Sequence, residues 1–158
     1  MSSETDFNKL SRFDYQEDLN VYVEVLYGGK MPEKKHENDA GWDVFSPKDF
    51  SLKYFEHIKL GLKIKLDIPK GYYYDLRPKS SLNAFPVLTQ LGLIDEPYVG
   101  ELAIVMVNLS DNILKIKAHE KIGQLVLNKN YNEKMRFTNA ILKNTERGEG
   151  GFGSTGRF

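Results

Sequence analysis

The last residues of the chain combine side chains that suit a phosphate chain and a nucleotide base. Arg147 precedes the segment Gly148–Gly156, in which five of nine residues are glycine and which also holds Phe152, Ser154 and Thr155. Glycines let successive backbone amides point into one concavity, hydroxyls add donors, and arginine adds a charged fork. A lone aromatic ring among glycines can stack on a base. The same composition is also common in ordinary chain ends, and no P-loop motif is present.

A second candidate is the stretch Gly92–Glu101, GLIDEPYVGE, where Asp95 and Tyr98 stand three positions apart. Pro97 has no amide hydrogen and cannot continue a sheet, so the stretch predicts a β-hairpin turn. Aspartate and tyrosine are ordinary turn residues, and the turn alone indicates no function. The apolar run that follows, LAIVMVN at 102–108, predicts a fully buried strand. Functional loops are often found on such rigid supports.

Composition limits the classes of function. A chain of 158 residues predicts one globular domain, and 22 basic against 22 acidic residues leave no net field to hold a long nucleic acid. With no cysteine, the chain cannot form a disulfide, a thiolate zinc site or a thiol nucleophile. No apolar stretch approaches the roughly 18 residues of a membrane span. We therefore expect a soluble protein of the cytoplasm or nucleus, with no membrane partner.

The chain predicts an all-β fold, a jelly-roll-like barrel or sandwich of short strands separated by turn residues. No window outside the N-terminal segment has a convincing helical period. We divide the chain into an N-terminal arm at 1–20, a β domain at 21–138 and a C-terminal arm at 139–158. The expected strands are Val21–Tyr27, Asp43–Phe45, Lys63–Ile68, Tyr72–Leu76, Leu102–Asn108, Ile113–Ile116, Gln124–Asn128 and Met135–Thr138.

Five segments, in order from Asp39 to Gly156, resemble the motifs of the trimeric all-β deoxyuridine triphosphatase (dUTPase) family. They are AGWDV at 40–44, PKSSL at 78–82, GLID at 92–95 with YVGE at 98–101, KIGQL at 121–125, and RGEGGFGSTG at 147–156. Taken singly, each is explained as a turn, loop or strand end, whereas the ordered set is highly specific. The resemblance implies the dUTPase-like β-clip fold and hydrolysis of dUTP to dUMP and pyrophosphate. This reaction limits uracil incorporation into DNA and supplies dUMP.

The resemblance also implies how the reaction proceeds. Asp95 would be the general base that deprotonates the water attacking the α-phosphorus. Mg²⁺ on the triphosphate would make that phosphorus electrophilic, and Asp43 would contact the ion through water, as suits a cation that retains its hydration.

Substrate recognition would fall to the same turn and to the C-terminal arm. The backbone of Gly92, Leu93 and Ile94 would read the uracil edge, too closely for the 5-methyl group of thymine, and Tyr98 would leave no room for a 2′-hydroxyl. Phe152 would cover the uracil ring. The other positions that match the family's substrate-binding motifs are Lys79, Ser80, Ser81, Gln124, Arg147, Gly153, Ser154 and Thr155.

Some residues depart from the family's usual pattern. Lys79 stands where arginine is common, which loses a bidentate fork but keeps the charge. Ser81 replaces a glycine and Pro97 an acidic residue, while His119 and Gly123 stand in place of glycine and alanine. These changes affect local loop shape and affinity rather than a group with a direct chemical role.

Two alternatives remain open. A dCTP deaminase shares the fold, but its family supplies a glutamate in the strand after the hairpin, where this chain has Val105. A non-catalytic nucleotide-binding regulator would be favoured by loss of Asp95, Asp43 or Arg147, all of which are present.

The resemblance finally implies a homotrimer with shared active sites, in which the C-terminal arm of one subunit reaches the site of a neighbour. The buried run at 102–108 is a candidate to line the threefold interface.

Overall fold

The computed structural model describes residues 19–79, 86–89, 92–140 and 144–148 and is built from β-strands, with no helix among these residues. This confirms the predicted all-β class. Alternating or β-branched apolar residues account for most of the strands. The strands are β1 (Tyr22–Val25), β2 (Gly41–Phe45), β3 (Phe50–Leu52), β4 (His57–Gly61), β5 (Ile64–Asp67), β6 (Tyr72–Pro78), β7 (Val87–Thr89), β8 (Gly92–Ile94), β9 (Ala103–Asn108), β10 (Leu114–Ile116) and β11 (Lys121–Lys129).

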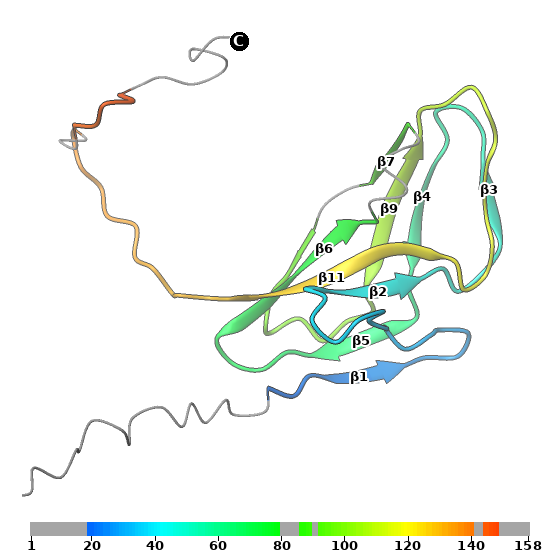
Figure 1. Ribbon diagram of the computed structural model, residues 1–158, viewed down its shortest axis with the longest axis horizontal. Coiled ribbons are helices and arrows are strands. Elements are labelled where there is room, and N and C mark those ends of the chain that lie inside the picture. The colour runs from blue at the N-terminus through cyan, green and yellow to red at the C-terminus, as the bar shows by residue number, and fades with distance from the viewer. Residues whose placement is uncertain (1–18, 80–85, 90–91, 141–143, 149–158) are drawn as a thin grey trace, which may run out of the picture.

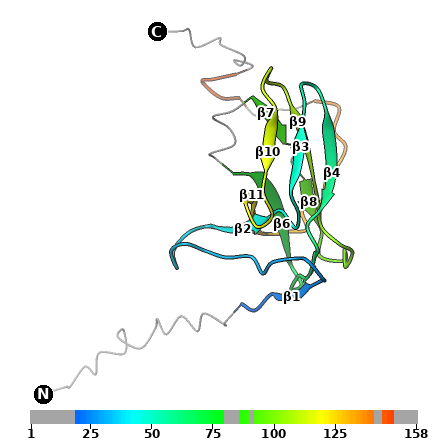
Figure 2. The same cartoon turned by 90° about the vertical axis from the view of Figure 1, so that its right-hand side faces the viewer.

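The strands form four antiparallel sheets around one core. The largest has the order β2-β11-β6-β8 and the next has the order β4-β9-β7, while β1 pairs with β5 and β10 with β3. Figure 1 shows β2, β11 and β6 side by side, and Figure 2 shows the β10–β3 pair at the opposite end of the molecule from β1. Both larger sheets place side chains in a single apolar cluster, which includes Leu76, Ile104, Met106 and Leu125.

The strand after the Asp95 turn differs from its predicted burial. The run at 102–108 is not fully buried, because side chains alternate between the two faces of β9. Ile104 and Met106 lie in the core, whereas Val105 and Val107 are half-exposed on the outer face. Both faces are apolar, so the sequence alone could not distinguish a strand covered on two sides from one with a free apolar face.

The predicted hairpin at the Asp95 turn is also wrong. The strand before the turn, β8, pairs with β6, whereas the strand after it, β9, pairs with β4 and β7. The Tyr98 N–H donates a hydrogen bond of 3.0 Å to the Asp95 carbonyl, so the bend itself is a genuine turn. It connects the two larger sheets instead of two paired strands.

The predicted strand Met135–Thr138 is absent. These residues are exposed and carry no strand pairing within the described part of the chain, with Met135 94% and Phe137 92% exposed. Composition favoured a strand, but a strand also needs a partner for its backbone groups. In Figure 1 this segment leaves β11 and runs away from the sheets. Among the residues that the structure describes, there is no helix that could span a membrane.

Candidate functional site

Five of the predicted site residues line one cavity of about 300 Å³ at the end of β8. They are Gly92, Leu93, Ile94, Asp95 and Tyr98, and the cavity is completed by Lys59, Leu76, Glu101, Leu102 and Ala103. Ile94 is buried and fixes the end of β8 in the core, while Asp95 is exposed and Tyr98 is 48% exposed. The structure therefore presents a carboxylate and an aromatic ring to a ligand from a rigidly supported turn.

Hydrogen bonds hold this turn from both sides. The Tyr98 hydroxyl donates to the Glu101 carbonyl at 2.8 Å, and the Gly71 N–H donates to Glu96 Oε2 at 3.2 Å. The second bond ties the turn to the loop between β5 and β6. Together they restrict where the Asp95 carboxylate and the Tyr98 ring can lie.

The strand β8 also offers backbone groups to a ligand. It is the last strand in the order β2-β11-β6-β8, so among the described residues one edge of its backbone faces no strand. Free N–H and C=O groups on a sheet edge are hydrogen-bonding partners for a second chain or a planar ligand. Gly92, Leu93 and Ile94 of this strand line the cavity next to Asp95, where Gly92 adds no side chain.

Asp43 and Gln124 form a second group on the same sheet. Gln124 on β11 is in register with Asp43 on β2 and Arg77 on β6, so the three lie in one row across the sheet. Three strand spacings, about 14 Å, separate β2 from β8. Lys79 follows directly after β6 and is half-buried. A single chain thus places Asp43 and Gln124 away from Asp95.

The Asp43 carboxylate is held by a lysine. Lys121 Nζ lies 2.6 Å from Asp43 Oδ2, and this hydrogen bond raises the pKa of Lys121 above its usual value. Among the described residues, no group of three or more histidine, cysteine, aspartate or glutamate side chains could hold a metal ion.

Arg147 is not among the residues that line the Asp95 cavity. Arg147 lies in the exposed segment 144–148, which Figure 1 shows well away from the sheets. Ser80, Ser81, Phe152, Gly153, Ser154 and Thr155 lie outside the described residues.

Sequence reasoning missed Lys59 and Glu101 as residues of the cavity. Lys59 is an exposed residue of β4, a strand that the composition HIKLG did not reveal. Glu101 follows Gly100 at the end of the turn, and its proximity to Asp95 could have been inferred from spacing alone. The approach of Lys59 depends on the pairing of β4 with β9.

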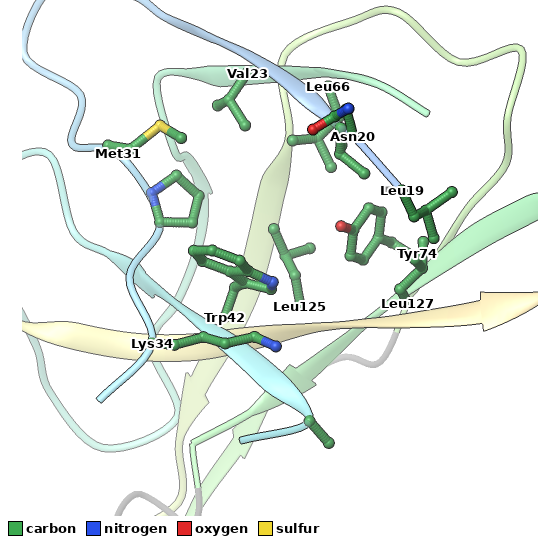
Figure 3. Close-up of a pocket in the computed structure, with 13 residues that line it drawn as sticks. Leu19, Asn20, Val23, Met31, Lys34, Trp42, Leu66, Tyr74, Leu125 and Leu127 are labelled. Atoms are coloured by element: carbon green, nitrogen blue, oxygen red, sulfur yellow. The ribbon is translucent and has the colours of Figure 1, made fainter. Parts of the chain in front are cut away.

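A larger cavity, of about 400 Å³, lies between the start of β1 and the β2-β11-β6 strands. Figure 3 shows Trp42, Leu125, Tyr74 and Leu127 lining it, with Lys34 at its rim. Lys34 Nζ lies 5.1 Å from the centre of the Trp42 ring, and burial raises the pKa of Tyr74. Its lining is mostly apolar and contains none of the predicted catalytic or binding residues, so the cavity at Asp95 is the candidate site.

Comparison with known proteins shows which family the chain resembles. The family profile described as dUTPase matches residues 28–156. The deoxyuridine 5′-triphosphate nucleotidohydrolase of Fusobacterium nucleatum is 39% identical over 145 residues, covering 87% of this chain and 98% of the relative. The same enzyme of Candida albicans is 34% identical and covers 99% of both chains.

A solved structure shows the same fold. The dUTPase of Staphylococcus bacteriophage 80alpha, determined with dUPNHPP, superposes with a TM-score of 0.79 at 27% identity, covering 87% of this chain and 98% of the phage protein. The profile spans most of the chain, and the relatives match over nearly their full length. The chain is therefore a member of the dUTPase family.

Proposed function

We propose that this chain hydrolyses dUTP to dUMP and pyrophosphate at the cavity beside Asp95. The observation that carries the proposal is the convergence of three groups: the exposed Asp95 carboxylate, the Tyr98 ring and the free edge of β8. The carboxylate can act as a general base toward water, and the ring can form a wall beside the sugar. The strand edge can form hydrogen bonds with a planar nucleobase.

Asp95 is suited to activate water. Its side chain is exposed at a turn held by hydrogen bonds, so it can orient a water molecule with little movement. The water oxygen bonds to the α-phosphorus and its proton passes to the carboxylate. The bond from the α-phosphorus to the bridging oxygen breaks, and pyrophosphate leaves.

Recognition of deoxyuridine follows from the cavity walls. Backbone N–H and C=O groups of Gly92–Ile94 provide both donors and acceptors, as the uracil edge requires. Their close approach leaves no room for the 5-methyl group of thymine. The Tyr98 ring, packed against the deoxyribose, excludes a 2′-hydroxyl.

Magnesium fits this site only as a partner of the substrate. The D95N mutant dUTPase of S. aureus phage phi11, which is similar in fold, coordinates a structural Mg(II) ion. Mg²⁺ retains several waters and binds phosphate oxygens. Lys121 already donates a hydrogen bond to Oδ2 of Asp43. This carboxylate is therefore better suited to contact the ion through a water molecule than to coordinate it directly. When bound to the triphosphate, the ion supplies polarisation of the phosphorus.

The proposed assembly is a homotrimer with shared active sites. The outer face of the β4-β9-β7 sheet carries three apolar side chains: Leu88 is exposed, and Val105 and Val107 are half-buried. Lys59 and Ala103, on the same face, also line the Asp95 cavity. A second subunit packed on this face would stand beside the cavity and could bring its own Asp43, Gln124 and C-terminal arm to it.

The test is release of pyrophosphate with Mg²⁺ from dUTP, dTTP, dCTP and UTP, measured for the natural chain and for Asp95→Asn. We expect rapid release from dUTP alone and a fall of about 10²–10⁴-fold in Asp95→Asn, the usual contribution of a general base. Asp111→Asn, in the exposed loop after β9, is the matched control and should retain activity. Intact dUTP, or full activity in Asp95→Asn, would contradict the proposal, and ammonia release from dCTP would then be assayed.

A further inference from the structure

We propose that Gly100 and Glu101 are positioning residues that fix the Tyr98 ring and thereby set discrimination between dUTP and UTP. The inference rests on the proposed function, since it concerns the sugar wall of the same cavity. Neither residue carries a chemical step. Their role is to keep the ring where a 2′-hydroxyl would collide with it.

The Tyr98 ring lies directly against the backbone of Gly100. A Cβ atom at Gly100 would stand 2.5 Å from the Tyr98 hydroxyl oxygen and 2.6 Å from Cζ, far inside van der Waals contact. The hydroxyl donates to the Glu101 carbonyl at 2.8 Å. The hydroxyl end of the ring is therefore packed against residue 100 and hydrogen-bonded to residue 101.

The Glu101 peptide is in turn clamped to the turn between β4 and β5. Glu101 Oε1 accepts a hydrogen bond of 3.2 Å from the Lys63 N–H, and Lys63 Nζ lies 3.3 Å from the same oxygen. The Leu102 N–H donates to the Ile64 carbonyl at 2.9 Å, and the Leu62 N–H donates to the Leu102 carbonyl at 2.8 Å. The carbonyl that receives the Tyr98 hydroxyl thus belongs to a segment fixed on both sides.

Gly61 makes room for this clamp. A Cβ atom at Gly61 would overlap Glu101 Oε1, and the three heavy atoms nearest to that position all belong to the Glu101 carboxylate. Gly61 does not have a positive φ, so alanine is compatible with its backbone. The carboxylate can reach Lys63 only because residue 61 has no side chain.

Rigidity matters here because an apolar wall alone rejects an added hydroxyl by only about 100-fold. A ring that can move away accommodates the extra oxygen and loses that selectivity. A displacement of about 1 Å can change a rate about 100-fold. Loosening Glu101 should therefore affect UTP and dUTP differently, which general destabilisation of the fold would not do.

The experiment compares kcat/KM for dUTP and UTP in the natural chain and in Glu101→Gln, Glu101→Ala, Gly61→Ala, Gly100→Ala and the double variant Gly61→Ala/Glu101→Ala. We expect Glu101→Ala, Gly61→Ala and Gly100→Ala each to lower the dUTP-to-UTP ratio at least about tenfold. Glu101→Gln retains an oxygen for the Lys63 N–H and should keep the ratio. In the double variant, Gly61→Ala should add almost nothing, because the atoms it displaces are gone.

Melting temperatures measured alongside separate this role from a purely structural one. An unchanged ratio in Glu101→Ala and Gly61→Ala, whatever the melting temperature, would overturn the inference, as would fully additive effects in the double variant. If Glu101→Ala does not fold, Gly61→Ala and Gly100→Ala decide the outcome through the same ratio. A natural chain that leaves dUTP intact overturns the proposed function and this inference with it, whereas an active chain with unchanged ratios overturns the inference alone.

Discussion

At the scale of single residues, Gly41 controls the position of Gln124, a predicted substrate-binding residue. A Cβ atom at Gly41 would lie 2.5 Å from Gln124 Oε1, so the Gln124 amide rests directly on β2. We predict that Gly41→Ala displaces this amide and raises KM for dUTP about tenfold, the cost of one hydrogen bond to a charged group. Steady-state kinetics measure it. In a Gln124→Ala background the same substitution should have little further effect, and an equal rise there would contradict the explanation.

The predicted site residues that the structure brings together are those that are close in sequence. Gly92–Ile94, Asp95 and Tyr98 share one cavity because they belong to one strand end and its turn. Lys59 reaches the same cavity through pairing of β4 with β9, a contact between distant parts of the sequence. The composition of β4 gives no sign that this strand pairs with β9, so the sequence did not predict Lys59 as a residue of the cavity.

At the scale of elements, the turn between β10 and β11 contains a strained residue. His119 has a φ of 64°, a left-handed conformation that costs an L-residue about 1–2 kcal/mol relative to glycine. Because glycine also loses more conformational entropy on folding, we predict that His119→Gly stabilises the protein by up to about 1 kcal/mol. Thermal or urea unfolding measures it.

His36→Gly is the matched control, since His36 is an exposed histidine without a positive φ. It should be neutral or destabilising. A loss of stability in His119→Gly would show that the side chain contributes more than the backbone strain costs.

The same turn is tied to the loop after β2 by a carboxylate. Asp49 accepts a hydrogen bond of 2.8 Å from the Ala118 N–H and pairs with Lys117 Nζ at 3.0 Å, which lowers the pKa of Asp49 below its usual 3.8. A lowered pKa in the folded state stabilises the protein above pH 3.8, and this contribution is lost as pH falls through the folded value.

We therefore predict that Asp49→Asn lowers the melting temperature at pH 7, and that the difference from the natural chain shrinks as pH falls below 3.8. Asparagine can still accept the Ala118 N–H, so the variant isolates the charge. Melting curves across that pH range test the prediction. A difference that stays constant with pH would argue that the charge contributes nothing.

Element prediction from sequence depended on length and on the presence of a partner. The alternating stretch at β5 and the aromatic stretch at β6 were found, whereas β3, with three residues, and β4, with a histidine and a lysine, were missed. Met135–Thr138 has strand composition but no partner among the described residues. Pairing between distant strands is not encoded in local composition, so neither error could be avoided from sequence.

At the scale of the whole molecule, the outer face of the β4-β9-β7 sheet should determine assembly. We predict that Val107→Glu converts the proposed trimer to smaller species, because it places a charge in the centre of the apolar face. Sedimentation at micromolar concentration measures the mass. Ile113→Glu, at an exposed isoleucine outside that sheet, is the control and should remain trimeric. A natural chain that sediments as a monomer would count strongly against the trimer.

The place of β11 in the sheet order has a consequence for how the chain acquires its structure. This strand, Lys121–Lys129, is late in the sequence but lies between β2 and β6 in the sheet. One edge of β11 pairs with β2 and the other edge pairs with β6. Before it is available, β2 has no strand partner in this sheet, and β6 is paired on one side only. Closing such long loops makes folding slow. During synthesis β2 therefore has no partner in this sheet, and one edge of β6 stays open, until residue 129 has been made. In that interval the chain depends most on protection from aggregation.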